Sequence, residues 1–258
     1  MKVTVCQLHD ESDLFTRDWD ALTAHLRNER SELVVLPQMP FCPSFLERHH
    51  FDFATWQAAL AAHDAGEKRL HALAPTMVVS SRPMDFGNER YHECFLWDEA
   101  SGVRTLHGES VANEHEVPWF LAATPDFVPT EVATVLLGVL FCSEFDRTAE
   151  LERYAHEGVA LIVTPRSVVT GESENCRENA RRIALASGAY QLSSNRVSDD
   201  GRFDGGGWII DPAGRVLCQT DSQQPFATIE VNAWQGHRVK RSSERDLRSV
   251  IDTPRGHR

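Results

Sequence analysis

The chain has very few lysines. Its 258 residues contain only Lys2, Lys68 and Lys240, and acidic residues outnumber basic ones, which gives a formal net charge of -12 at pH 7. Because such a charge repels the phosphates of nucleic acids and of anionic lipids, neither is expected as a partner. A mechanism that needs a lysine between Lys68 and Lys240 is excluded.

The sequence also has no apolar run that approaches the length of a bilayer span. Met1 leads directly into a strand-like segment at residues 3–8, without the charged region, apolar region and cleavage site of a secretory signal. We therefore expect a cytoplasmic protein that does not contact membranes.

Cysteine is present, but not in a metal-binding or disulfide pattern. The six cysteines are Cys6, Cys42, Cys94, Cys142, Cys176 and Cys218. They form no C-x-x-C pair, so most are expected to be small buried residues. No cofactor and no metal are predicted, although His107, Glu109 and His115 are residue types that can bind a metal.

Composition and periodicity indicate one globular α/β domain across residues 1–258. Hydrophobic residues make up 41% and charged residues 25%, and no linker, repeat or low-complexity tract divides the chain. Polar residues from about 234 to 258 predict a C-terminal arm or tail. Apolar runs predict strands at 3–8, 33–36, 76–81, 94–97, 133–141, 159–164, 190–194, 207–210 and 216–218. Helical spacing predicts helices at 14–26, 56–73, 148–157 and 178–186.

Cys142 directly follows a predicted apolar strand and precedes a predicted helix. In α/β proteins, this position lies at the carboxyl edge of a sheet, where ligands usually bind. The N–H groups that follow and the helix N-terminus are expected to lower the pKa of the thiol and to bind an oxyanion. This context is compatible with a nucleophile and with a buried structural cysteine.

Several segments, in this order, resemble the carbon–nitrogen hydrolase (nitrilase) superfamily, which includes nitrilases, aliphatic amidases, ureidopropionases and carbamoylases. The segments are Val3–Leu8, Val34–Phe41, Gly138–Gly158, Leu161–Arg166, Ala180–Arg196 and Gly205–Pro212. The resemblance implies a four-layer αββα sandwich that forms a homodimer or a larger homo-oligomer through a helical face. It also implies a small-molecule substrate and a site built from glutamate, lysine and cysteine.

The three family roles do not all carry over. In the family, the glutamate is a general base, the lysine supports the oxyanion and the cysteine forms a thioester. Cys142 matches the nucleophile, and the N–H of Ser143 matches the oxyanion hole. Gln38 stands at the position of the base, where its amide can hold a water, a substrate or the thiol but cannot take a proton.

The position of the lysine falls on an acidic or neutral residue. An ungapped alignment places Glu109 there, and small gaps place Ser110 or Asn113 there instead. Glu116 matches the supporting acidic residue, with Glu114 or His115 beside it, although these residues also fit a solvated loop.

Other residues of the resembling segments are candidates for contacts with a substrate. These are Phe41, His115, Trp119 and Arg166. The loop at residues 42–53, which contains His49 and His50, is a candidate for the wall of the pocket.

The substitutions make ordinary amide or nitrile hydrolysis improbable. Loss of one oxyanion-hole donor costs about 2.7 to 4 kcal/mol, and a carboxylate about 4 Å away adds repulsion on the order of 4 kcal/mol at an effective dielectric near 20. Two interpretations follow. Either Cys142 still performs covalent chemistry with Glu109 or Glu116 as the proton-transfer group, or the protein is a catalytically inactive binding or partner subunit.

Overall fold

The computed structural model of the protein describes residues 1–110, 116–123 and 127–232. The predicted C-terminal arm lies outside these residues. The helices are α1 (Ser12–Glu29), α2 (Phe53–Leu70), α3 (Thr148–Glu157) and α4 (Ser173–Ser187), and the 3-10 turns are η1 (His71–Leu73) and η2 (Cys142–Glu144). The strands are β1 (Lys2–His9), β2 (Leu33–Val35), β3 (Met77–Phe86), β4 (Glu89–Asp98), β5 (Gly102–Gly108), β6 (Thr130–Val132), β7 (Val135–Val139), β8 (Leu161–Pro165), β9 (Tyr190–Val197), β10 (Trp208–Ile210), β11 (Val216–Gln219) and β12 (Phe226–Glu230).

The strands form two halves that are joined through β1. One half has the order β5-β4-β3-β2-β1-β12, and the other has the order β6-β7-β8-β9-β10-β11. Residues Val3–Val5 of β1 pair in parallel with β2, whereas Gln7–His9 pair in parallel with β9. A single strand therefore fixes the position of one half relative to the other.

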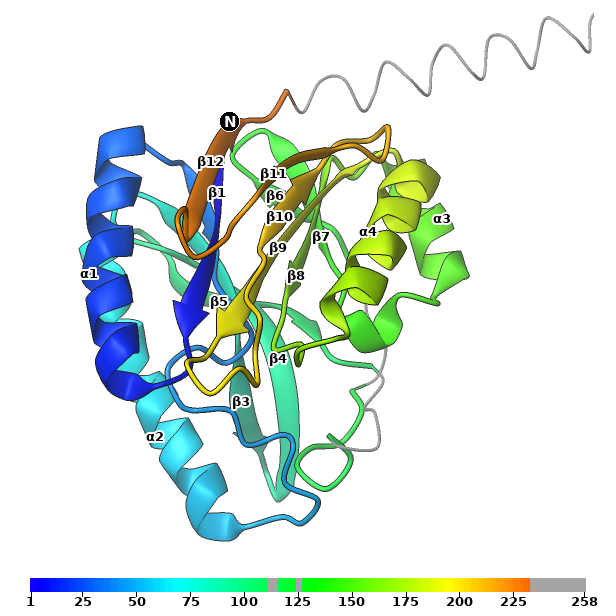
Figure 1. Ribbon diagram of the computed structural model, residues 1–258. Coiled ribbons are helices and arrows are strands. Elements are labelled where there is room, and N and C mark those ends of the chain that lie inside the picture. The colour runs from blue at the N-terminus through cyan, green and yellow to red at the C-terminus, as the bar shows by residue number, and fades with distance from the viewer. Residues whose placement is uncertain (111–115, 124–126, 233–258) are drawn as a thin grey trace, which may run out of the picture.

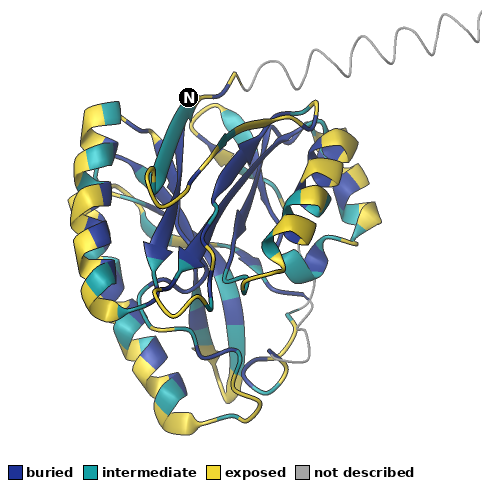
Figure 2. Ribbon diagram, viewed as in Figure 1, coloured by how far each residue is buried: buried dark blue, intermediate teal, exposed yellow. Residues whose placement is uncertain are grey.

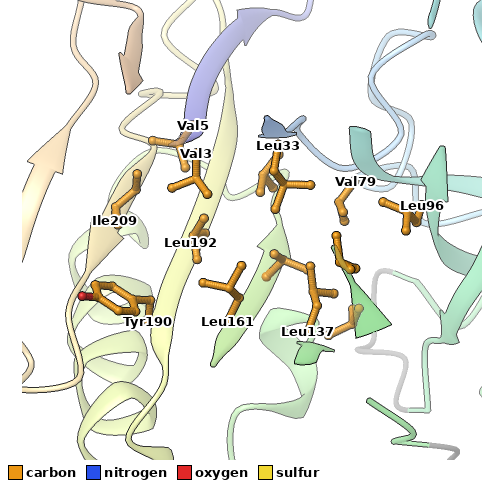
Figure 3. Packing of buried hydrophobic residues seen from close by; sticks show 14 of the residues in the cluster. Val3, Val5, Leu33, Val79, Leu96, Leu137, Leu161, Tyr190, Leu192 and Ile209 are labelled. Carbon is orange, nitrogen blue, oxygen red and sulfur yellow. The ribbon is translucent and has the colours of Figure 1, made fainter. Parts of the chain in front are cut away.

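Helices cover the outer faces of the two halves, as Figure 1 shows, with α1 and α2 on one side and α3 and α4 on the other. The strands between them are largely buried, and the helices expose their outer faces (Figure 2). Side chains from both halves meet in the middle, among them Val3, Leu33 and Val79 from one half and Leu161 and Leu192 from the other (Figure 3). This is the αββα sandwich expected from the sequence.

The amphipathic pattern of α1 explains how an outer layer attaches. Phe15, Trp19, Leu22 and Leu26 recur at helical spacing and are buried against the outer face of the first half. The strands between the helices bury both faces, so β2 is apolar throughout instead of alternating.

Some boundaries differ from the predictions. The strand predicted at 133–141 is β7, which ends at Val139, and the unpredicted single turn η2 begins at Cys142. α4 begins at Ser173, earlier than predicted, and β6 and β12 were not predicted. Within the described part of the chain, no helix is both long and apolar enough to cross a membrane.

Candidate active site

A cavity of about 310 Å³ brings together residues that are far apart in the sequence. Gln38 follows β2, Cys142 and Ser143 follow β7, and Glu109 follows β5, and all four line its wall. β2, β7 and β8 belong to parallel pairs, and the carboxyl ends of such strands are where α/β proteins usually bind ligands. Glu116 also lines the wall. Leu46 and Glu47 contribute the part that comes from the predicted pocket loop.

The segment that carries Gln38 is held by a buried arginine of β9. The Arg196 guanidinium donates a hydrogen bond of 2.9 Å to the Gln38 carbonyl and another to the carbonyl of Met39. It is paired with the buried carboxylate of Asp10. Met39 has a positive φ of 43°, which non-glycine residues seldom adopt, so these bonds hold the backbone in an uncommon conformation beside the cavity.

The turn that carries Cys142 is held by the buried carboxylate of Glu144. This carboxylate accepts hydrogen bonds from the Phe141 N–H at 3.0 Å, the Ser110 N–H at 2.8 Å and the His107 ring at 2.9 Å. Burial alone raises the pKa of Glu144, but the hydrogen bonds from His107, Ser110 and Phe141 outweigh burial and hold the pKa below its ordinary value. Glu144 is therefore an ionised clamp that joins η2 to the end of β5.

A buried chain of hydrogen bonds leads from the cavity wall into the protein. The Ser143 hydroxyl donates to Glu109, whose other oxygen is 2.7 Å from Nδ1 of His92. Nε2 of His92 is 2.8 Å from the Ser81 hydroxyl. Among the members of this chain, Glu109 and Ser143 line the cavity, so the chain connects the cavity to the interior.

Burial makes both ionisable groups of this hydrogen-bond network, Glu109 and His92, neutral. It raises the pKa of Glu109 to about 8 and lowers the pKa of His92 to about 4. Near pH 7, Glu109 is thus a carboxylic acid that donates to Nδ1 of His92, and Nε2–H of His92 donates to Ser81. The carboxylate repulsion considered from the sequence is therefore absent near neutral pH.

A second sulfur lies next to Cys142. Sγ of Cys142 is 3.0 Å from Sγ of Cys176, a buried residue of α4. The hydrogen bond from Cys142 lowers the pKa of Cys176, and the nearby Arg166 charge adds to this effect against burial. The hydrogen bond to Cys176, together with burial, raises the pKa of Cys142 well above its usual range. The predicted lowering of the Cys142 pKa by a helix N-terminus was therefore wrong.

Arg166 lies close enough to the two sulfurs to act on both through its charge, and it does not line the cavity. It is fully buried, its guanidinium lies 3.6 Å from the centre of the Trp208 ring, and it donates hydrogen bonds of 2.6 Å to Ser193 and to the Gly206 carbonyl. Arg166 was predicted to contact a substrate, but in the structure its charge acts on the two thiols and favours their ionised forms. The geometry gives it a part in the site that the sequence did not indicate.

Two other candidates for substrate contact are packed away from the cavity. Phe41 lies against Trp19 on the side of α1. Trp119 is fully buried against Phe45, and its indole N–H donates to the Arg48 carbonyl. Sequence position placed both residues near the site, but it did not reveal which way their side chains point. The candidates Asn113, Glu114 and His115 lie outside the described residues.

The residue types that suggested a metal are engaged in other interactions. The carboxylate of Glu144 binds His107, and Glu109 bonds to His92 and Ser143. Within residues 1–110, 116–123 and 127–232, no group of three or more His, Cys, Asp or Glu side chains is arranged to hold a metal ion.

The sequence did not single out three residues of the site, namely His92, Cys176 and Glu144. Glu144 offered a weak signal, because a carboxylate two residues after a candidate nucleophile is close to it in any fold. His92 and Cys176 offered none, since β4 and α4 bring them to the site from distant parts of the chain.

Comparison with solved structures places this geometry in a known fold. A carbon–nitrogen hydrolase from Helicobacter pylori G27 has a TM-score of 0.80 at 14% identity, over 94% of this chain and 92% of that chain. An amidase from Nesterenkonia sp. has a TM-score of 0.75 at 18% identity, over 90% of both chains. The chain has the carbon–nitrogen hydrolase fold. No protein-family model and no curated protein matches it.

A further structure with the carbon–nitrogen hydrolase fold is a variant of the amidase from Nesterenkonia sp. AN1 in which glutamine replaces a glutamate. It carries acrylamide joined by Michael addition to its active-site cysteine. Its TM-score is 0.72 at 18% identity, over 96% of this chain and 99% of that chain. At such identities, the similarity concerns the fold and leaves the chemistry to be argued from the residues.

Proposed function

We propose that the protein is a cysteine-dependent enzyme in which Cys142 attacks an electrophilic carbon of a small amide-, nitrile- or acyl-type substrate. The observation that carries the proposal is the joint presence of Cys142, Ser143, Gln38 and a neutral Glu109 on the wall of one cavity. A nucleophile, an N–H donor, an orienting amide and a proton donor are the groups that acyl transfer requires.

The proton of Cys142 has an acceptor at hand. The sulfur of Cys176 is 3.0 Å away and is the more acidic of the two thiols, so its thiolate can take the proton as Cys142 attacks. This arrangement supplies the base that Gln38 cannot supply. Cys176 then acts as a general base in place of the glutamate that the family uses.

Neutral Glu109 supplies the proton for the other half of the step. Transfer to the substrate uses the other tautomer of this network, in which Nδ1–H of His92 donates to Glu109 and the acid proton of Glu109 points to Ser143. The Ser143 hydroxyl then takes that proton as it gives its own to the leaving group or to the developing oxyanion. The N–H of Ser143 lies at the start of a 3-10 turn, where a helical N–H has no intrahelical acceptor and can bind an oxyanion.

The amidase from Nesterenkonia sp. AN1 supports chemistry without the glutamate. Its glutamine variant also carries the acetamide moiety of fluoroacetamide on the active-site cysteine. In its double variant, the replaced glutamate and cysteine have the same separation along the chain as Gln38 and Cys142 here. We infer that Gln38 permits a covalent adduct at Cys142 but does not activate a water, so rapid hydrolysis of ordinary amides is not expected.

Acrylamide labelling followed by mass spectrometry tests the proposal. One adduct should form on Cys142 of the wild type and of Cys218→Ala, the matched control at another partly buried cysteine. Cys142→Ala should lose this adduct. If Cys142 reacts no faster than Cys218 in the folded protein, the nucleophile is misassigned.

A noncatalytic binding role is the second candidate. It is favoured by the raised pKa of Cys142 and by the neutral or acidic residues at the family's base and lysine positions. Turnover of short amides, nitriles and esters across the wild type, Cys142→Ala and Glu109→Gln separates the two candidates. The enzyme should lose activity in Cys142→Ala and change it sharply in Glu109→Gln. A biological activity that is unchanged in both variants would support the binding role.

A further inference from the structure

The two neighbouring sulfurs allow a reaction that needs no substrate of the enzyme. A disulfide has an S–S distance of about 2.05 Å, and Sγ of Cys142 is already 3.0 Å from Sγ of Cys176. The two sulfurs must therefore approach each other by about 1 Å, and small side-chain rotations of Cys142 and Cys176 would suffice. The two residues lie on different elements, so the bond would tie the cavity turn to the helix behind it.

We propose that Cys142 and Cys176 form a reversible disulfide when a hydroperoxide enters the cavity. Cys142 lines the cavity and is partly exposed, so it is the sulfur that the oxidant meets. Cys176 is 7% exposed and does not line the cavity, so it acts from behind as the resolving thiol. The site would be an oxidative modification site that the cavity makes accessible from one side.

The environment of Cys176 fits the role of a resolving thiol. The hydrogen bond from Cys142 lowers the pKa of Cys176, and the fully buried Arg166 adds to this effect through its charge and a hydrogen bond to the sulfur. A buried guanidinium charge is costly without a nearby anion, so Arg166 favours the thiolate form of Cys176 over the thiol. Ser193 and Gly206 hold the rest of the guanidinium, so the charge stays in place while the thiols react.

The reaction balances in two steps. First, the Cys142 thiol attacks the hydroperoxide, the O–O bond breaks, and Cys142 becomes a sulfenic acid while an alcohol, or water from hydrogen peroxide, is released. Second, the Cys176 thiolate attacks the sulfenic sulfur, an S–S bond forms and hydroxide leaves. The two sulfurs together lose two electrons, and the hydroperoxide gains them.

The bond would also switch off the site, a consequence that rests on the proposed function. The disulfide removes both the Cys142 nucleophile and the Cys176 base, and reduction by a thiol restores them. Oxidation would therefore be protective, since a sulfenic acid without a resolving partner proceeds to irreversible sulfinic acid.

Peptide mapping under nonreducing conditions tests the inference. Hydrogen peroxide is added to the folded protein, which is then alkylated and digested with trypsin. In the wild type, the peptide of residues 105–147 should become linked to the peptide of residues 167–177, and dithiothreitol should separate them. Cys218→Ser, the matched control, should give the same linked peptide. Cys176→Ser should give a sulfenic acid on Cys142, trapped by dimedone, that proceeds to sulfinic acid.

The inference is overturned if the wild type gives no linked peptide and Cys142 is overoxidised as fast as in Cys176→Ser. A thermal melt of Cys176→Ser shows whether that variant is folded, and the wild-type result stands without it. The two proposals can fail separately. A linked peptide without acrylamide labelling or turnover would support the disulfide and contradict the proposed enzymatic function.

Discussion

Replacing Glu109 with glutamine should flatten the pH dependence of the stability of this protein above pH 6.5. The buried carboxyl binds its proton more tightly in the folded chain than in the unfolded chain, since its pKa rises from 4.5 to about 8. Its contribution is therefore complete below pH 4.5 and is lost as the pH rises toward 8. Glutamine resembles the protonated acid and can still donate to His92 and accept from Ser143, so Glu109→Gln keeps the bonds and removes the titration.

The expected magnitude follows from both members of the pair. Burial lowers the pKa of His92 from 6.5 to about 4, so the contribution of His92 is complete above pH 6.5 and is lost as the pH falls toward 4. Between pH 4.5 and 6.5, the two effects oppose each other and nearly cancel. Between pH 6.5 and 8, Glu109 is the member of this pair that titrates. At about 1.4 kcal/mol per pH unit, the wild type should lose about 2 kcal/mol of unfolding free energy through it.

Urea unfolding of the wild type and Glu109→Gln at pH 6.5, 7.25 and 8 measures this difference. Titration of Cys176 affects both proteins, so subtracting one pH profile from the other leaves the part that is due to Glu109. The exposed carboxylate variant Glu99→Gln is the control and should follow the wild type. Parallel profiles for the wild type and Glu109→Gln would refute the neutral pair and would indicate an ionised Glu109 paired with a protonated His92.

Two other outcomes are expected. Glu144→Gln should lower the unfolding free energy in urea by about 3 to 5 kcal/mol, because an amide replaces the buried carboxylate that accepts hydrogen bonds from Phe141, Ser110 and His107. Exposed Glu152→Gln should change it little, and equal values for the two variants would contradict the clamp. We also propose that the protein forms a homodimer through the side of α4, where Leu185 of α4 and Leu217 of β11 are exposed. Light scattering at micromolar concentration should give twice the mass of one chain, and the mass of a monomer would contradict this proposal.

Local patterns determined much of the fold and one member of the site. The helical spacing of the apolar residues in α1 and the apolar runs of β2 and of Leu161–Val163 in β8 are properties of neighbouring residues, so they can be read without the structure. The same holds for Cys142 after an apolar strand, whereas Gln38 was singled out through the resemblance to the carbon–nitrogen hydrolase superfamily. The helix at residues 148–157 was predicted with its observed bounds.

Tertiary structure alone decided what surrounds Cys142. The resemblance left Glu109, Ser110 or Asn113 at the position of the family's lysine, and the charge of Glu109 depends on burial beside His92, which β4 brings to it. Burial and Cys176 likewise reversed the predicted direction of the Cys142 pKa. Phe41 packs against Trp19 and does not line the cavity, because the direction of a side chain is set by packing. A sequence records which groups are present, and their distances and desolvation, which set proton affinity, arise only when distant segments meet.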